Sequence, residues 1–296
     1  MKILVFYSGG KDSQACLIKA VKDYGSANIQ AVFCDTGWEH PLTYDHIKTT
    51  TEQLGVELII LKSEKYDGFL DLAKQKGRFP SVKARFCTEE LKAKPAIDYV
   101  LGLNDSSIVI QGIRKDESLS RSKMEEQCSY FKFYFQPYGK NKKGKELFHT
   151  YRKKDVFAYC LKYNADVLRP IFNWTAQQTI DFIRDNGQLP NPLYYQGFSR
   201  VGCFPCIMSR HQEIKQIMII SPETIELIKQ KETEIGSTYL APRYVPDKFS
   251  SGVDKKGNKI NTMSDVEKYL KAKNASELLY DDHKGFSCMS YYGLCE

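Results

Sequence analysis

The stretch SGGKDS, residues 8–13, follows an apolar run at the N-terminus and gathers small, hydroxyl and charged residues. Its two glycines let backbone N–H groups approach an anion closely, its two serines add hydroxyl donors, and Lys11 adds a positive charge. An ordinary strand-to-helix turn capped by Asp12 or Ser13 is the alternative interpretation. The residue types favour a site for phosphate or sulfate. The spacing fits neither the P-loop nor G-x-G-x-x-G, which argues against a P-loop kinase and a dinucleotide dehydrogenase.

A second group of chemically capable residues is GCFPC, which places Cys203 and Cys206 at C-x-x-C spacing. The glycine before the pair and the proline inside it favour a turn that directs two thiolates at one centre, either zinc or an iron–sulfur cluster. A redox pair is the alternative, although that motif normally precedes a helix in a small thioredoxin-like fold.

The nine cysteines of the 296-residue chain do not resemble a disulfide framework, because their number is odd and the N-terminus lacks the pattern of a signal peptide. No run approaches the roughly 18 apolar residues of a membrane span, so we expect a cytoplasmic protein that does not contact the membrane. Four cysteines lie within expected helices or strands or apart from the motifs and are expected to be inert: Cys16, Cys34, Cys128 and Cys160.

Alternating elements are expected to position these groups. Strand-like runs lie at residues 2–7, 29–35, 56–62 and 105–113. Helix-like segments lie at residues 12–25 and 42–55, and each ends on a glycine. Strands and helices in this alternation predict an α/β fold with a doubly wound parallel sheet. Ligands of such sheets bind at the carboxyl ends of the strands, which is where residues 8–13 follow the first strand.

Residues 168–187 begin extended and continue as a helix with Asn173 or Thr175 as its N-cap. After residue 210 the alternation of strands and helices ends. Residues 213–236 predict two helices broken at Ser221-Pro222. Residues 241–265 are rich in turn formers. We therefore predict a nucleotide-binding domain over residues 1–210 and a mostly helical, irregular C-terminal appendage over residues 211–296.

The net charge of +7 suits an anionic small substrate or a nucleic acid equally well. Part of it lies in GKNKKGKE, residues 139–146, which is interpreted as a solvated loop.

Five motifs in order resemble the phosphoadenylylsulfate and adenylylsulfate reductases of the ATP-pyrophosphatase (adenine nucleotide alpha hydrolase) superfamily. They are SGGKDS, FCDTGWEHPLTYD (33–45), GIRKDESLSRS (112–122), RPIFNWTAQQTIDFI (169–183) and NPLYYQGFSRVGCFPC (191–206). The resemblance covers residues 3 to about 210 and implies an adenine nucleotide as ligand. It assigns the anion to Ser8, Gly9, Gly10, Lys11, Asp12 and Ser13, the adenine and ribose side to Phe33 and Asp35, and the anionic end to Arg114, Lys115 and Arg121. Asp35 could instead cap the turn that follows it, and the arginine-containing segment could be a surface charge run.

The resemblance also implies a cysteine-bound centre, with Cys87, Cys203 and Cys206 as ligands of a 4Fe-4S cluster, or of zinc as the alternative. Cluster-bearing adenylylsulfate reductases have an adjacent Cys-Cys where this chain has Cys87 alone. The fourth ligand is then Cys288 or Cys295, and the same two tail cysteines are the candidates for the catalytic nucleophile. The tail lacks the Glu-Cys-Gly-[LI]-His motif of the reductases.

Three functions stay open. A reductase-like enzyme would transfer or reduce sulfur from PAPS or APS with a thioredoxin-like thiol donor. An ATP-pyrophosphatase-type enzyme would cleave ATP with Mg²⁺, either as a sulfate adenylyltransferase does or to thiolate a nucleic acid, and the intact SGGKDS loop favours it. A nucleotide-binding module without turnover is the third, because contact is not catalysis. We also expect a homo-oligomer.

Overall fold

The computed structural model describes residues 1–254, 257 and 259–273. Its first strand, β1 (Lys2–Phe6), lies between two apolar cores. Its alternate side chains face opposite sides: Ile3 and Val5 belong to one core, and Leu4 belongs to the other. Because both faces are buried, the strand is a continuous apolar run, as is typical of parallel sheets covered by helices.

Six strands form the central sheet in the order β3-β2-β1-β4-β8-β5. Neighbouring strands pair in parallel, except that the edge strand β5 pairs antiparallel with β8. The other bounds are β2 (Ile29–Cys34), β3 (Glu57–Leu61), β4 (Ser107–Gln111), β5 (Gln127–Ser129) and β8 (Ala165–Leu168). The predicted doubly wound α/β class is confirmed.

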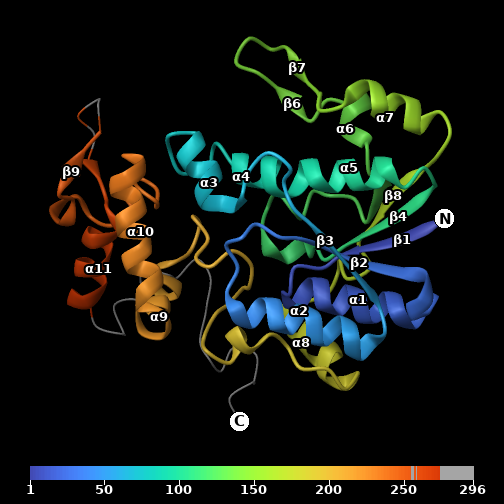
Figure 1. The fold of residues 1–296 in the computed structure, drawn as a ribbon, viewed down its shortest axis with the longest axis horizontal. Coiled ribbons are helices and arrows are strands. Elements are labelled where there is room, and N and C mark those ends of the chain that lie inside the picture. The colour runs from blue at the N-terminus through green and yellow to red at the C-terminus, as the bar shows by residue number, and fades with distance from the viewer. Residues whose placement is uncertain (255–256, 258, 274–296) are drawn as a thin grey trace. The chain divides into compact units, whose positions relative to one another are not determined.

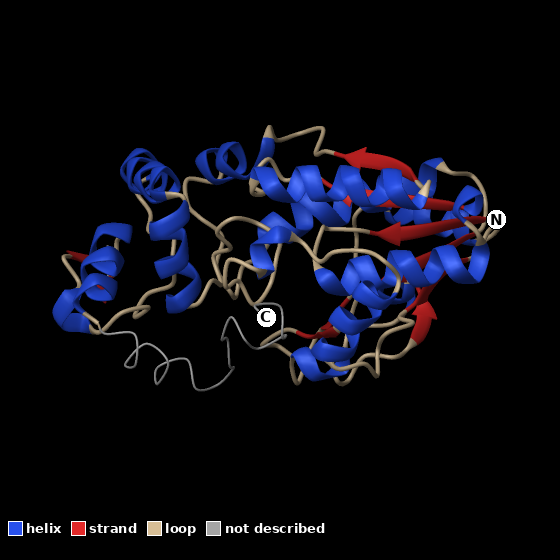
Figure 2. Cartoon of the chain, turned by 90° about the horizontal axis from the view of Figure 1, so that it is seen from below, coloured by secondary structure: helices blue, strands red, loops and turns tan. Residues whose placement is uncertain are grey.

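Helices cover both faces of the sheet, as Figures 1 and 2 show. Side chains of three helices line one core, α1 (Lys11–Tyr24), α2 (Pro41–Leu54) and α8 (Ala176–Asp185). Side chains of three others line the second core, α5 (Lys94–Gly102), α6 (Lys132–Phe135) and α7 (Lys153–Cys160). A small hairpin, β6 (Gly139–Lys140) and β7 (Glu146–Leu147), follows α6.

Local sequence signals account for two of these elements. Thr175, one of the two predicted caps, begins α8, since its side chain accepts a hydrogen bond of 3.1 Å from the Gln178 N–H. Ser221-Pro222 separates α9 (His211–Ile220) from α10 (Pro222–Ile235), as the sequence predicts.

The described chain divides into two compact units that interleave along the sequence. Unit one comprises Met1–Cys34, Tyr44–Leu61 and Ala93–Asn191. Unit two comprises Asp35–Thr43, Lys62–Lys92 and the described part of Pro192–Glu296. The predicted domain boundary at residue 210 stays a prediction.

Unit two has its own apolar core, in which Trp38 and Phe69 pack with side chains from beyond residue 210, among them Tyr239. Its remaining elements are α3 (Gly68–Gln75), α4 (Phe86–Thr88), a π-helical turn (Glu89–Ala93), β9 (Gly252–Val253), β10 (Lys259–Ile260) and α11 (Met263–Ala272). The described region after residue 210 is mainly helical with irregular turns, as predicted. Within the described ranges, no helix combines the length and the apolar character that crossing a bilayer requires.

Candidate functional site

The loop between β1 and α1 has the geometry of an anion cradle. Gly9 has a φ of 75°, a left-handed conformation that favours glycine, and the extended Gly10 is the N-cap of α1. The helix therefore begins at Lys11 and presents its first N–H groups, which have no partner within a helix, to the loop. Such a terminus binds phosphate and sulfate groups.

Hydrogen bonds inside the loop fix its shape. The Ser13 hydroxyl donates to the Gly10 carbonyl at 2.9 Å and accepts from the Ser8 N–H at 3.2 Å. The hydroxyl oxygens of Ser8 and Ser13 lie 3.4 Å apart. The predicted loop residues thus form one connected turn.

Two buried amides outside the loop hold it in place, and neither has a role that its residue type or spacing predicts. The Asn191 side chain donates to the Gly9 carbonyl at 3.2 Å, and the Gln14 side chain donates to the Leu189 carbonyl at 2.9 Å. Asn191 and Gln14 are both fully buried. The only sequence signal for Asn191 is its position at the start of the NPLYYQGF motif.

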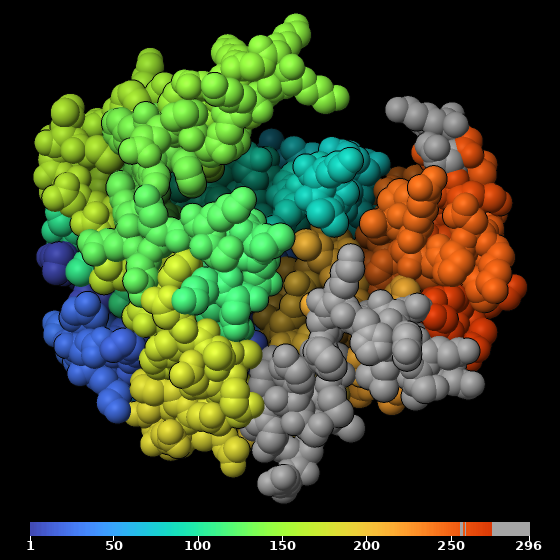
Figure 3. All heavy atoms as spheres, turned by 180° about the vertical axis from the view of Figure 1, so that it is seen from behind, coloured from blue at the N-terminus to red at the C-terminus, as the bar shows by residue number. Residues whose placement is uncertain are grey.

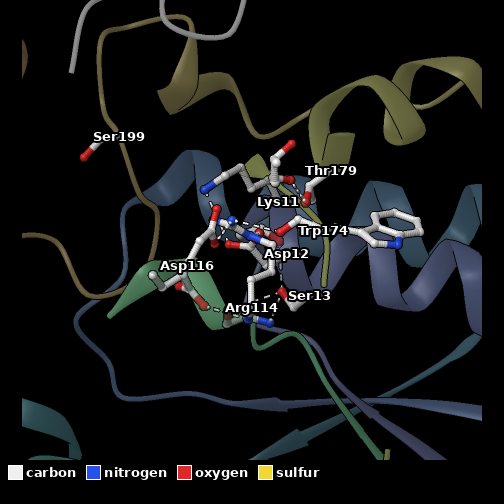
Figure 4. Close-up of polar contacts among 12 residues, drawn as sticks. Lys11, Asp12, Ser13, Arg114, Asp116, Trp174, Thr179 and Ser199 are labelled. Carbon is white, nitrogen blue, oxygen red and sulfur yellow. Dashed lines mark hydrogen bonds and ion pairs between the residues drawn. The ribbon is translucent and has the colours of Figure 1, made fainter. Parts of the chain in front are cut away.

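A buried charge network lies at the start of α1 (Figure 4). Arg114 Nε donates to Asp12 Oδ1 at 2.6 Å, and the Lys11 ammonium lies 3.4 Å from Asp12 Oδ2. Arg114 also pairs with Asp116, and it is only 4% exposed. Burial lowers the pKa of Arg114, but the neighbouring carboxylates of Asp12, Asp116 and Glu117 outweigh that effect and raise its pKa. The guanidinium therefore stays charged beside the loop.

The segment that carries Arg114 approaches α1 closely at Gly112. A Cβ atom at Gly112 would lie 2.6 Å from the Asp12 carbonyl carbon and 2.6 Å from the Ser13 nitrogen. Real side chains do not tolerate such a separation, so only glycine lets the end of β4 pack against the first turn of α1.

The two other cations of the predicted anion-binding segment differ from Arg114 in their exposure. Arg121 is partly exposed and pairs with Glu117, and Lys115 is exposed. The Lys115 backbone donates to the Phe172 carbonyl at 2.9 Å, which fixes the segment next to the chain that follows β8. Arg121 reaches the network only through Glu117, and contact of either side chain with a nucleotide stays a proposal.

Phe33 and Asp35 lie in different surroundings. Phe33 is buried at 2% exposure, and its ring packs edge-on against Tyr44 with centroids 5.9 Å apart. The Asp35 carboxylate accepts from the Gly37 N–H at 2.8 Å and lies 3.2 Å from the Lys62 ammonium. Asp35 thus caps the turn that follows it, which is the structural alternative given above.

Unit two contains the C-x-x-C turn. The Phe204 N–H donates to the Trp38 carbonyl at 2.7 Å, and the Pro205 carbonyl accepts from the Trp38 indole at 3.0 Å and from the Tyr239 hydroxyl at 2.5 Å. After the turn, the Cys206 N–H donates to the Ser209 hydroxyl at 3.1 Å. Buried aromatic donors therefore hold the turn that carries both cysteines.

The three predicted ligand cysteines are partly buried and pack against the same core of unit two. Burial raises the pKa of Tyr239 well above its usual value, and Cys206, Cys203 and Cys87 act in the same direction. Burial also raises the pKa of Cys87 and of Cys203, while Lys92 lowers that of Cys203. Thiolates are the donors that zinc and iron–sulfur clusters prefer.

The chemistry of these donors thus fits such a centre, but their arrangement does not complete one. Across residues 1–254, 257 and 259–273, no three His, Cys, Asp or Glu side chains are arranged to hold a metal ion. The Cys203 sulfur lies 3.8 Å from the Thr36 hydroxyl and 3.9 Å from the Glu39 carboxylate. The predicted fourth ligand and nucleophile, Cys288 or Cys295, lies outside the described residues.

The sequence profile of the phosphoadenosine phosphosulfate reductase domain matches residues 2–209. A 37.8 kDa protein of Escherichia phage 186, described as uncharacterized, is 30% identical over 284 residues, which cover 79% of this chain and 75% of the phage protein. Two uncharacterized proteins of Methanocaldococcus jannaschii are 29% and 26% identical over 73% of this chain, and the matched regions span only 38% and 44% of those proteins.

Among solved structures, the phosphoadenylyl-sulfate reductase of Candida auris in complex with phosphate is similar, with a TM-score of 0.47, 16% identity, and coverage of 70% of this chain and 83% of that one. The FMN adenylyltransferase of Candida glabrata in complex with FAD and pyrophosphate gives a TM-score of 0.43, 14% identity, and coverage of 68% and 55%.

Proposed function

The chain belongs to the phosphoadenosine phosphosulfate reductase domain family, and from that membership we propose that it is an enzyme that binds an adenine nucleotide at residues 8–13 and acts in sulfur transfer or reduction. The observation that carries the proposal is the loop itself. Gly9, the N-terminus of α1 and the buried Lys11 together present N–H groups and a positive charge at the carboxyl end of β1. That arrangement suits the phosphate or sulfate group of the nucleotide.

The reductase reaction needs a thiolate and a leaving nucleotide. The thiolate attacks the sulfur of the sulfonucleotide, the bond from that sulfur to the phosphate oxygen breaks, and AMP or its 3'-phosphorylated form leaves. The cysteine then carries an S-sulfonate. A thioredoxin-like donor attacks the cysteine sulfur with its own thiolate and releases sulfite as a mixed disulfide forms. Cys288 and Cys295 are our candidates for the attacking residue.

We further propose Cys87, Cys203 and Cys206 as ligands of a 4Fe-4S cluster or of zinc, completed by one of the tail cysteines. Support comes from their packing against one core of unit two and from the C-x-x-C spacing of Cys203 and Cys206. A thiolate-bound cluster would transfer electrons or stabilise the fold of unit two.

A second candidate function is ATP cleavage to AMP and pyrophosphate, with Mg²⁺ and adenylation of a substrate. One observation favours it: all six residues of SGGKDS are present, and they form a continuous turn through the Ser8, Gly10 and Ser13 hydrogen bonds. An intact cradle of this kind is suited to a pyrophosphate group, which is larger than a single sulfate.

A side-by-side turnover assay tests both functions. The purified chain is incubated with APS, with PAPS and with ATP plus Mg²⁺, and sulfite, AMP and pyrophosphate are measured. The reductase function predicts sulfite from a sulfonucleotide in the presence of thioredoxin and a sulfonate adduct on a tail cysteine by mass spectrometry. Release of pyrophosphate from ATP, with no sulfite from APS or PAPS, would contradict the reductase function and support ATP cleavage.

Two variants make the assay specific for the loop. Lys11→Met should abolish whichever turnover is observed, and Lys19→Met, further along α1, should not. Binding of a nucleotide without turnover of any of the three would contradict both enzymatic proposals and support a binding module.

A further inference from the structure

The positive charge of the chain is concentrated in one short segment. Residues 132–154 contain eight of the 43 Lys and Arg residues but one of the 36 Asp and Glu residues, a net charge of +7. The rest of the chain therefore has 35 of each sign and no net charge. The +7 of the whole protein is thus a local property of this segment, which we call the basic hairpin.

The basic hairpin is an ordered structure. The Asn141 side chain accepts from the Lys143 and Lys145 N–H groups at 2.9 and 3.0 Å, and the Asn141 N–H donates to the Lys145 carbonyl at 2.9 Å. Gly144, with a φ of 77°, completes the turn between β6 and β7. The sequence interpretation of a solvated loop is right about exposure, but the segment is a hairpin with a defined tip.

Strands β6 and β7 of the basic hairpin extend beyond α6 and α7 in Figure 1, and their atoms, in green, project from the surface in Figure 3. Six lysines of the basic hairpin are exposed and lack a carboxylate partner among the described residues, four of them in residues 139–146: Lys140, Lys142, Lys143, Lys145, Lys153 and Lys154. By contrast, Lys132 pairs with Glu125, and Arg152 pairs with Asp98 and Asp155. The tip therefore presents uncompensated charge, while the base of the hairpin is held by ion pairs.

Exposed aromatic rings belong to the same segment as these lysines. Phe133, Phe135 and Tyr138 are 42%, 53% and 51% exposed. Phe135 stacks on Phe157 at 4.9 Å between centroids, and Tyr138 packs edge-on against His149 at 5.2 Å. Phe135 and Tyr138 thus each pack against a neighbouring ring, so binding a ligand on them costs little further side-chain entropy.

We propose that the basic hairpin is a binding surface for single-stranded nucleic acid. Lysines along a projecting hairpin can pair with the phosphates of a nucleic-acid backbone, and exposed rings offer faces on which unpaired bases stack. Stacked bases of a duplex cannot reach such rings, which is why the surface favours a single strand over a double strand. An anionic membrane would bind the same lysines. It would not require aromatic rings, because any apolar side chain can insert between lipids.

Fluorescence anisotropy with labelled 20-nucleotide probes of mixed sequence tests the proposal, with single-stranded DNA and single-stranded RNA as separate arms. The triple variant Lys142→Gln, Lys143→Gln, Lys145→Gln should weaken binding about tenfold or more and reduce the slope of log affinity against log salt by about 2, since each single-strand phosphate contact contributes about 0.7. Phe135→Leu and Tyr138→Leu keep apolar bulk but remove a ring, and each should weaken binding about tenfold.

The matched control is Lys48→Gln, Lys248→Gln, Lys268→Gln, which removes the same charge from exposed positions outside the hairpin. It should leave binding and the salt slope nearly unchanged. Unaltered melting temperatures in all variants show that the fold is intact.

Four results would overturn the proposal: no binding of either probe, equal loss in the control triple, equal affinity for a duplex of the same sequence, or insensitivity to both ring variants. Phosphatidylserine vesicles serve as the other arm. Vesicle binding that depends on the lysines, without binding of the oligonucleotides, would assign the surface to a membrane instead.

Discussion

Arg114 Nε donates a 2.6 Å hydrogen bond to the carboxylate of Asp12, although 102 residues of sequence separate the two. The bond joins the segment after β4 to the first turn of α1. A guanidinium that is 5% exposed against a carboxylate that is 16% exposed is a buried pair, so removing either partner leaves a charge without compensation.

Arg114→Gln is therefore expected to lower the free energy of unfolding by about 3 kcal/mol. Arg121→Gln is the control, because its pair with Glu117 is more exposed, at 40% and 24% for the two side chains, and contributes about 0–1 kcal/mol. Urea denaturation measures both. Equal effects of the two substitutions would show that the Arg114 pair has no special importance.

Gly112→Ala is expected to displace the start of α1, because the added carbon would lie 2.6 Å from the backbone of Asp12 and Ser13. We expect a loss of about 1–3 kcal/mol in stability and a nucleotide dissociation constant raised at least about tenfold. Gly102→Ala, at a position with open space around its Cβ, should leave both unchanged or slightly improve stability. Unaltered nucleotide binding in Gly112→Ala would show that binding at the loop does not depend on the close packing of Gly112 against α1.

Lys11→Met keeps the apolar stem of a buried side chain and removes its charge. A charge-assisted hydrogen bond to a bound anion contributes about 1.5–3 kcal/mol, so isothermal titration should show nucleotide affinity lower by about 10- to 100-fold. Lys19→Met, which breaks only an exposed pair with Asp23, should bind as the unchanged protein does. An effect of equal size in the two variants would argue against an anion site at the loop.

His46 makes stability depend on pH. Burial lowers the pKa of His46 to about 4, from a usual value near 6.5, so between these values the unfolded chain binds more protons than the folded one. Stability contributed by neutral His46 is present above pH 6.5 and is lost as pH falls toward 4, by up to about 3 kcal/mol. His40, whose pKa burial also lowers, acts in the same direction.

His46→Gln can keep the hydrogen bond to Gln14, which lies 3.2 Å from the imidazole nitrogen, and it has no titrating ring. Urea denaturation between pH 4.5 and 7 should show a shallower pH dependence in this variant. Superimposable pH profiles of the variant and the unchanged protein would show that His46 does not titrate as stated.

Cys203→Ser and Cys206→Ser are each expected to abolish bound metal, because a C-x-x-C pair supplies two of the proposed ligands. The unchanged protein, purified without oxygen, should be brown and contain iron and sulfide, and Cys160→Ser, in unit one, should keep both. A colourless protein with one equivalent of zinc would leave only the zinc alternative. Absence of any metal would contradict the proposed centre.

The sequence predicts the first four strands of the sheet because each is a short apolar run bounded by glycines or polar turns. It does not predict β5, since Gln127–Ser129 is short and polar, and this strand exists because β8 offers an unpaired edge. The cap at Thr175 and the break at Pro222 were predictable, as both depend on residues within one turn of helix.

The site was predictable to the extent that it is local. Residues 8–13 carry the loop in their own types and spacing. Asn191 and Gly112 act on the loop through contacts that exist only after the chain has folded, and the ion pairing of Arg114 with Asp12 likewise depends on the order of strands in the sheet. Sequence spacing alone carries no information about such contacts.

The concentration of charge in residues 132–154 also has a consequence for the protein in bulk solution. Outside this segment acidic and basic side chains balance, so repulsion between copies of the molecule near neutral pH comes from one hairpin. A polyanion that covers the hairpin brings the whole molecule to its isoelectric condition. Neutralisation of the hairpin therefore removes the net charge that opposes precipitation of the protein.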